Sequence, residues 1–312
     1  MSILLLPAGA LLPSSLLSRR VMLGAATLAP FYPCSAAASE APRYIDREYT
    51  MQYSDAPRSR GVLLRRFTGE STPYTFKKTP IRLVKEWKYP FEDTFTSTDF
   101  SRADEHKDPE FYVVPRFVYH IDEASVSALT NYYKSSIKPN SAILDICSSW
   151  VSHYPLDFPT TMSTIKACGL NKFELMANDQ LTGGFEVVDL NPRDSISNLD
   201  SPIKLPYPDD SFDVVTCVVS IDYLNRPVEV LNEVKRVLKV GGKVIVSQSD
   251  RFFPSKVVNM WLNMNDRSRL ELINGYFHFA GGFEPRDCWD ISPSGADARD
   301  PMFIVEAKLA SK

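Results

Sequence analysis

The sequence predicts an α/β fold in which a mostly parallel sheet is covered by helices on both faces. Apolar runs of strand length recur after residue 140 and do not alternate with polar residues, as expected for strands that are buried on both faces. An amphipathic helix separates two of these runs, which favours alternating strands and helices around a parallel sheet. The runs span 142–147, 185–189, 212–220, 243–248 and 302–307.

The composition is that of an ordinary globular protein. The chain has 312 residues and a net charge of −3, which is enough length for one large core with a small appendage. No stripe of Lys and Arg with interleaved aromatic residues is visible, so nucleic acid is not an expected partner. The five cysteines lack the paired C-x-x-C spacing of a zinc site, and no metal is expected.

Residues 1–39 have the composition of a targeting segment. They contain no Asp or Glu, and Arg19 and Arg20 are their only charged residues. An apolar run follows the arginines, and the pattern resembles a twin-arginine export signal. Pro30 and Pro33 interrupt that run before the roughly 20 residues of a membrane anchor, so no stable membrane insertion is expected. The acid-free stretch before the arginines is typical of a transit peptide and favours the chloroplast, with delivery to the thylakoid lumen; bacterial export is the alternative.

An irregular N-terminal extension is expected over 40–110, before a folded domain over 111–312. The extension is polar and shows no sustained helical or strand period, apart from one short strand around 61–67. We expect it to pack as a belt on the domain, with a substrate lid as the alternative.

Two helices are predicted with their ends. Asp122 or Glu123 caps the first, which continues to Ile137 with apolar residues at helical spacing. The second begins at an Asn225 cap with Pro227 in its first turn. After it, two consecutive glycines at 241–242 are expected to let the chain leave the helix and enter a strand.

The most specific sequence pattern lies between 205 and 246. It reads LPYPDDSFDVV over 205–215 and RVLKVGGKVIV over 236–246. This pattern resembles the type 11 group of class I S-adenosylmethionine-dependent methyltransferases, whose signature is LPFPDxSFDxV followed by a helix that ends RVLKPGG. The resemblance covers about 120–312. It implies a Rossmann-like class I methyltransferase fold, S-adenosylmethionine as the cofactor and a small-molecule methyl acceptor.

The family's first cofactor motif is a strand, an acid and a glycine-rich loop that lets the ligand approach the backbone. In this chain Cys147, Ser149 and Val151 stand where the glycines are expected. The resemblance implies that Trp150 and Val151 point away from the cofactor, and that serine hydroxyls replace backbone donors. The implied cofactor residues of this motif are Asp145, Cys147, Ser148 and Ser149.

Three further cofactor contacts are implied by the same resemblance. Asn171 occupies the position of the acid that accepts hydrogen bonds from the ribose hydroxyls. Asp189 would receive the adenine amino group, with Leu190 beside the ring, although Asp189 could also be a surface turn acid. Ser220, Asp222 and Tyr223 follow the central strand, at the edge where ligands of parallel sheets gather, while a helix cap is the alternative for Asp222.

Three histidines lie in segments with a narrower resemblance. The segments 115–122, 144–153 and 276–283 are similar to a plant, algal and bacterial group of methyltransferase-like proteins with a glycine-poor first motif. Since an oxygen or nitrogen acceptor needs a base, the candidate catalytic residues are His153, His120 and Asp222. A structural role is the alternative for each histidine, including His278. For Arg116 the alternatives are binding an anionic substrate, binding the cofactor carboxylate, and pairing with a nearby acid.

The sequence therefore favours S-adenosylmethionine-dependent methyl transfer to a small molecule. A catalytically silent domain of the same fold, which binds a ligand or a protein, is the first alternative. A nicotinamide oxidoreductase is disfavoured, because 145–150 lacks the glycines that a pyrophosphate requires at a helix start.

Overall fold

The computed structural model describes residues 44–49, 62–67, 77–83, 95, 98–192, 201–295 and 298–312. Contacts divide the chain into Met1–Ala41 and Pro42–Lys312. The predicted targeting segment over 1–39 lies outside the described residues, and the expected domain boundaries remain predictions. None of the helices described is both long enough and apolar enough to cross a membrane.

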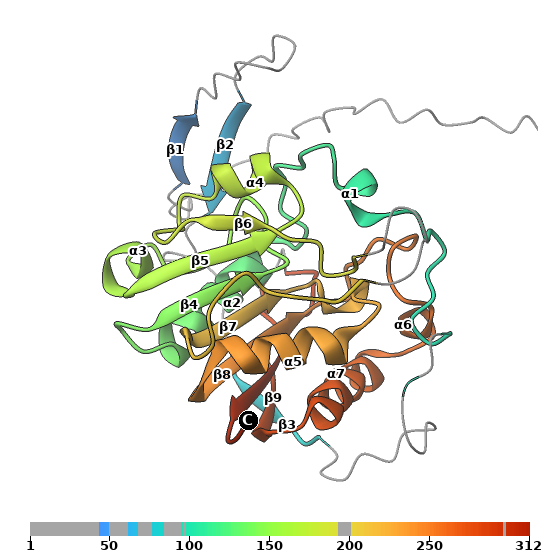
Figure 1. The fold of residues 1–312 in the computed structure, drawn as a ribbon. Coiled ribbons are helices and arrows are strands. Elements are labelled where there is room, and N and C mark those ends of the chain that lie inside the picture. Colours follow the sequence, from blue (N-terminus) through green and yellow to red (C-terminus); the bar gives the residue numbers. More distant parts are fainter. Residues whose placement is uncertain are drawn as a thin grey trace, which may run out of the picture. The chain divides into compact units, whose positions relative to one another are not determined.

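An eight-stranded sheet forms the centre of the described domain, in the order β3–β9–β10–β8–β7–β4–β5–β6 (Figure 1). The five strands from β6 to β8 run parallel, in the arrangement of a doubly wound nucleotide-binding sheet. The other three pair antiparallel to their neighbours, so the sheet is parallel only in part. The strands are β3 (Thr79–Ile81), β4 (Ala142–Ile146), β5 (Thr164–Gly169), β6 (Phe185–Val187), β7 (Phe212–Val218), β8 (Leu238–Gln248), β9 (Phe283–Asp290) and β10 (Phe303–Leu309).

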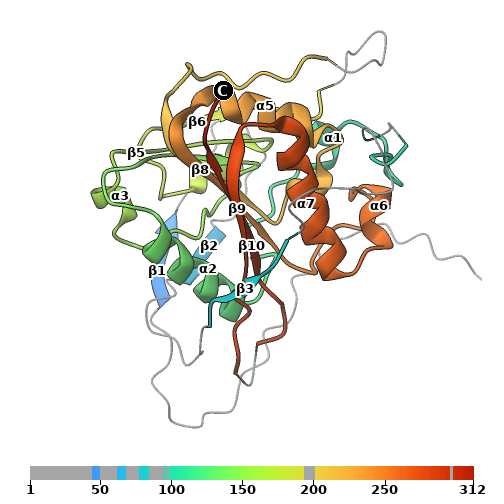
Figure 2. The ribbon, with the colours of Figure 1, turned by 90° about the horizontal axis from the view of Figure 1, so that it is seen from below.

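Helices cover both faces of this sheet, as predicted (Figures 1 and 2). Alternate residues of one strand enter two different cores: Ile143 packs with the α2 side, and Leu144 packs with the α5 and α7 side. Strands buried on both faces have no polar side, which explains their uninterrupted apolar runs. The helices are α1 (Asp108–Phe111), α2 (Glu123–Ser136), α3 (Phe158–Thr161), α4 (Lys172–Ala177), α5 (Pro227–Val237), α6 (Asn259–Leu262) and α7 (Asp266–Ala280), with a 3-10 turn, η1, at Ile221–Tyr223.

The ends of α2 follow the sequence prediction. The Asp122 carboxylate accepts a hydrogen bond from the backbone N–H of Ser125 at 2.7 Å and caps the helix. Helix α5 also begins with Pro227 in its first turn, but its N-cap is Arg226. The Asn225 cap was therefore wrong. The Asn225 backbone N–H instead donates to the side chain of Asn191.

The two glycines after α5 act inside a strand, not at the helix end. Helix α5 ends at Val237 and β8 begins at once with Leu238. Gly241 has a φ of 85°, in the left-handed region, and the β7–β8 register shifts between Phe212 and Val214. The glycines thus form an irregularity that realigns β8 with β7, which corrects the predicted role.

Parts of the predicted extension are ordered. The strand expected around 61–67 is confirmed as β2 (Val62–Phe67), which pairs antiparallel with β1 (Tyr44–Tyr49). Farther along, the segment before α1 is fastened to the domain: the Asp104 N–H donates to the Ser255 carbonyl at 2.8 Å, and the Asn259 N–H donates to the Ser101 carbonyl at 2.7 Å. This portion of the chain is packed on the domain.

Candidate active site

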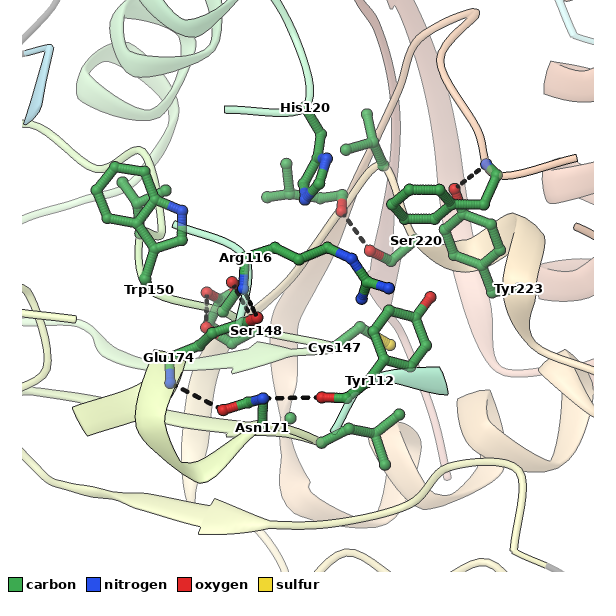
Figure 3. Close-up of a pocket in the computed structure, with 18 of the residues that line it drawn as sticks. Tyr112, Arg116, His120, Cys147, Ser148, Trp150, Asn171, Glu174, Ser220 and Tyr223 are labelled. Atoms are coloured by element: carbon green, nitrogen blue, oxygen red, sulfur yellow. Dashed lines mark hydrogen bonds between the residues drawn. The ribbon is translucent and has the colours of Figure 1, made fainter. Parts of the chain in front are cut away.

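A cavity of about 330 Å³ opens at the carboxyl ends of β4, β5, β6 and β7. This is the edge where open parallel sheets bind ligands, and the volume is within the range of small-molecule sites. Residues 108–121, named here the covering segment, form one wall, and 251–253 after β8 form another. Figure 3 shows side chains from these parts of the chain converging on one space.

The loop after β4 reaches the cavity without glycines of its own. Cys147 takes a left-handed φ of 54°, a conformation that usually requires glycine. Ser148 then lies against the end of β5, where its N–H donates to the Cys168 carbonyl at 2.8 Å. A Cβ on Gly169 would lie 2.1 Å from the Ser148 carbonyl oxygen. The close backbone approach therefore depends on a glycine of the neighbouring strand.

Asp145 stabilises this loop through its side chain. Its carboxylate accepts hydrogen bonds from the Ser148 hydroxyl at 2.7 Å and from the Thr216 hydroxyl at 2.9 Å. Burial raises its pKa to about 6. Asp145 and Ser148 line the cavity, but both carboxylate oxygens of Asp145 already accept hydrogen bonds from the protein. The Ser148 oxygen keeps lone pairs with which it can accept a bond from a ligand amino group.

Trp150 leaves the cavity open. Its indole N–H donates to the Val118 carbonyl at 3.1 Å, and its ring lies 5.1 Å from the Tyr119 ring and 6.5 Å from the Phe117 ring. The side chain thus forms part of the wall beside the covering segment. Val151 also lines the cavity without filling it.

Asn171 lines the cavity, but its side chain serves the protein. The amide oxygen accepts from the N–H groups of Phe173 at 2.9 Å and Glu174 at 3.2 Å, which caps α4. Its NH₂ donates to the Tyr112 carbonyl at 2.8 Å. Because a carbonyl oxygen has two lone pairs, an added bond from a ribose hydroxyl would have to replace part of this cap. A ribose hydroxyl that bound Asn171 would therefore weaken the cap of α4, and this cost reduces the affinity that Asn171 can provide for the cofactor.

Glu174 is a cavity residue that sequence reasoning missed. One carboxylate oxygen accepts from the Arg116 backbone N–H at 2.6 Å, and the other accepts from the Ser149 hydroxyl at 2.6 Å. It thereby joins the covering segment to the loop after β4. The signal was present: an Asn cap followed three residues later by Glu is typical of a helix start.

Asp189 and Leu190 lie together on the cavity wall after β6. One oxygen of Asp189 accepts from the Asn191 N–H at 2.8 Å, and burial raises the pKa of this carboxyl. Leu190 is buried beside it. Asn191, another missed residue, donates to Asp108 at 2.7 Å and so connects this wall to the covering segment.

The residues after β7 divide between the cavity and the core. Ser220 and Tyr223 line the cavity, and the Tyr223 hydroxyl accepts from the Phe253 N–H at 2.8 Å. Asp222 is not among the lining residues, contrary to its predicted catalytic role. Its side chain is fully buried, and neither carboxyl oxygen has a partner among the residues that the structure describes. Burial raises its pKa to about 8.

Two of the three singled-out histidines reach the cavity. The His120 ring lies 5.4 Å from the Phe253 ring, and desolvation together with the nearby Arg116 lowers the pKa of its imidazole. His153 lines the cavity with a left-handed φ of 58° and accepts through its carbonyl from the Thr130 hydroxyl. His278, on α7, is not a lining residue.

Comparisons with known proteins found one matching family model and several similar solved structures. Residues 188–246 match the family model described as a type 11 methyltransferase domain. No curated protein matches the chain. Similar solved structures include an S-adenosylmethionine-dependent methyltransferase from Aquifex aeolicus, 14% identical, with a TM-score of 0.41, covering 65% of this chain and 98% of the other. The corresponding enzyme from Mesorhizobium loti is 16% identical, with a TM-score of 0.38, and covers 58% and 97%. The [4+2]-cyclase SpnF is 17% identical, with a TM-score of 0.42, and covers 59% and 81%.

The fold is thus the Rossmann-like fold of methyltransferases, and the family match supports S-adenosylmethionine as the cofactor. The residues present fit that molecule in three respects. The cavity has the size of a small-molecule site, the Cys147 backbone takes the glycine-like conformation, and a half-buried acid lies beside buried Leu190.

Proposed function

We propose that this protein transfers a methyl group from S-adenosylmethionine to a small-molecule acceptor. The observation that carries the proposal is the cavity at the carboxyl ends of β4 to β7, which stays open beside Trp150. The segment matched by the methyltransferase family model contributes the β6 side and the β7 side of that cavity. A catalytically silent domain that bound only a protein partner would need no such space.

The residues of the cavity can bind the cofactor and align the acceptor in the following way. When bound, S-adenosylmethionine supplies an electrophilic methyl group. The free oxygen of Asp189 would accept from the adenine amino group, with Leu190 against the ring. Ser148 and the Cys147 backbone would hold the amino-acid end. The cavity walls exclude water and align the acceptor for in-line displacement, which is the main requirement of this chemistry.

His120 is the proposed general base. It lines the cavity, and because its pKa is lowered, the ring is neutral at pH 7 and has a nitrogen that can accept a proton. This nitrogen would take up the proton that the acceptor O–H or N–H loses when the methyl group passes to the acceptor atom and the thioether of the cofactor leaves. His153, deeper in the wall, is the second candidate.

The binding step is tested by calorimetric titration of the full chain with S-adenosylhomocysteine, with NADH as the comparison ligand. We expect micromolar binding of the nucleoside and none of NADH. Asp189→Ala should weaken binding about tenfold, since a lost hydrogen bond to a charged acceptor is worth roughly 1.4 kcal/mol or more. The matched control is Glu186→Ala, an exposed acid on neighbouring β6. A folded protein that binds no S-adenosylhomocysteine would favour the silent domain.

We further propose, from the leader and from segments 115–122, 144–153 and 276–283, that the protein is a member of the plant, algal and bacterial group with a glycine-poor first motif, acting in the chloroplast. The twin arginines favour delivery to the thylakoid lumen. A fluorescent fusion of the full chain, compared with an Arg19→Lys, Arg20→Lys double variant, tests this: the variant should remain in the stroma. Secretion from bacteria that express the wild-type chain alone would support the export alternative.

A further inference from the structure

The Arg116 side chain carries a positive charge into the middle of the cavity (Figure 3). Among the residues that the structure describes, its one side-chain hydrogen bond is from Nη2 to the Phe111 carbonyl, at 3.1 Å. The guanidinium lies 4.6 Å from the centre of the Phe111 ring and 5.6 Å from those of Tyr112 and Phe253. Across the described ranges, no carboxylate forms an ion pair with it.

Two acids of the cavity wall, Glu174 and Asp108, are already engaged by other groups. Both oxygens of Glu174 accept protein hydrogen bonds, one of them from the Arg116 backbone N–H. Asp108 is surrounded by cations, at 2.8 Å from Arg102 and 3.2 Å from Lys256. The alternative that Arg116 pairs with a nearby acid is therefore not realised.

A guanidinium presents five N–H donors, and the described part of the chain provides an acceptor for one of those of Arg116. Nη1 is enclosed and has no hydrogen-bond partner in the described structure. Aromatic faces attract the charge but accept no strong hydrogen bonds. Since an unsatisfied enclosed donor is unfavourable, this group is arranged to gain an acceptor when a ligand enters.

The rings around the guanidinium come from parts of the chain other than the loops expected to hold the cofactor. These rings belong to the covering segment and to Phe253 after β8. The loops expected to hold the cofactor follow β4 and β6. The sulfonium group of the cofactor would add a positive charge to this space, and the carboxylate of an acceptor would offset it.

We propose that the methyl acceptor is a small organic acid whose carboxylate binds Arg116. The apolar body of this acid would pack against Tyr112, Phe253 and Tyr223, beside His120. A monovalent carboxylate matches the single guanidinium and the planar fork of its donors. This inference rests on the proposed methyl transfer and specifies its substrate class.

The test measures binding of benzoate and cinnamate to the full chain, with benzamide and cinnamamide as uncharged counterparts. Each probe is titrated with and without saturating S-adenosylhomocysteine. We expect both acids to bind at least tenfold more tightly than their amides. Arg116→Met should abolish this preference, and Arg116→Lys should retain part of it. The matched control, Arg267→Met, removes an exposed arginine of α7 that pairs with Glu271. This variant should keep the wild-type preference for the acids over their amides.

The outcomes separate this inference from the proposed function. Binding of S-adenosylhomocysteine to the wild type tests the cofactor alone, and the titrations without it test Arg116 alone. Equal binding of acid and amide, no binding of either acid, or acid binding retained by Arg116→Met in a folded variant would overturn the inference. So would a tenfold loss of S-adenosylhomocysteine affinity in Arg116→Met without a loss for 5′-methylthioadenosine, because the carboxylate at Arg116 would then be the cofactor's.

Discussion

The parallel sheet contains two differently built parts. The β7–α5–β8 part follows the family pattern closely and is held by apolar packing, with Arg236 donating to the carbonyls of Leu205 and Tyr207 at 2.8 Å. The β4–β5–α4 part departs from the pattern and is held by polar contacts, such as Asp145 to Ser148 at 2.7 Å.

This difference separates what supports the fold from what shapes the site. In the first part the signature residues make a strand, a helix and their connections. In the second part the requirement for a close backbone approach is met by Gly169 on β5, and not by glycines in the loop. A loop without glycine can therefore still form such a cavity if the neighbouring strand supplies the space.

The largest effect on the β4–β5–α4 part is expected from Gly169→Ala. The new Cβ would lie 2.1 Å from a backbone oxygen of Ser148, which cannot turn away as a flexible side chain could. We expect a loss of about 3 kcal/mol in the free energy of unfolding in urea, together with weaker S-adenosylhomocysteine binding. Gly184→Ala is the control: its Cβ would meet no atom within 4 Å, so it should cost only about 1 kcal/mol of left-handed strain. Equal losses would show that the close approach is not what Gly169 provides.

Glu174→Ala tests the polar contacts of the same part. The change leaves the Arg116 N–H and the Ser149 hydroxyl without their acceptor. We expect about 2 kcal/mol lower stability, and faster hydrogen exchange of residues 108–121 because their attachment to α4 is weakened. Glu186→Ala, an exposed acid on β6, should leave both quantities unchanged. Unaltered exchange in Glu174→Ala would contradict the proposed link.

Asp222 is a buried acid in the otherwise apolar part of the sheet, and its raised pKa predicts that the stability of the protein depends on pH. Burial raises its pKa from 3.8 to about 8, so between these values the folded chain holds a proton that the unfolded chain has lost. This group therefore lowers stability as the pH rises from about 4 to 8. Asp222→Asn should equal the wild type near pH 4 and exceed it at pH 9 by several kcal/mol, because each unit by which the pKa is raised on folding is worth about 1.4 kcal/mol. Parallel stability curves for the two proteins, from urea unfolding at each pH, would rule this out.

The smallest effect is expected for Val240→Pro, which restores the family's usual residue. Val240 is exposed and lies in the irregular stretch of β8 between the paired residues Leu238 and Lys243. A proline there removes no pairing between β7 and β8 that the register requires. We expect a change below about 0.5 kcal/mol in thermal unfolding and no change in S-adenosylhomocysteine affinity. A large loss would mean that this part, too, depends on details beyond packing.

Most of the fold was predictable because the signals are local. Uninterrupted apolar runs identified β4, β7, β8 and β10, and capping residues placed the start of α2. The antiparallel direction of β10 was not foreseen, since an apolar run has no direction of pairing. Strand β9 was not predicted at all, because its sequence mixes charged and apolar residues and forms no apolar run. Asn225 failed as a cap for a similar reason: the residue type is suitable, but its N–H is engaged by Asn191.

The sequence by itself determined the elements, the two-faced burial of the central strands and the list of residues that could reach one edge of the sheet. Only the tertiary structure decided which of them share the cavity: it brought His120, Asp189 and Ser220 to it and turned Asp222 into the core. The physical reason is the distance along the chain over which each kind of interaction acts. Periodicity and caps act within a few residues, whereas Glu174 meets the Arg116 backbone across 58 positions, through a hydrogen bond that exists only after the chain has packed.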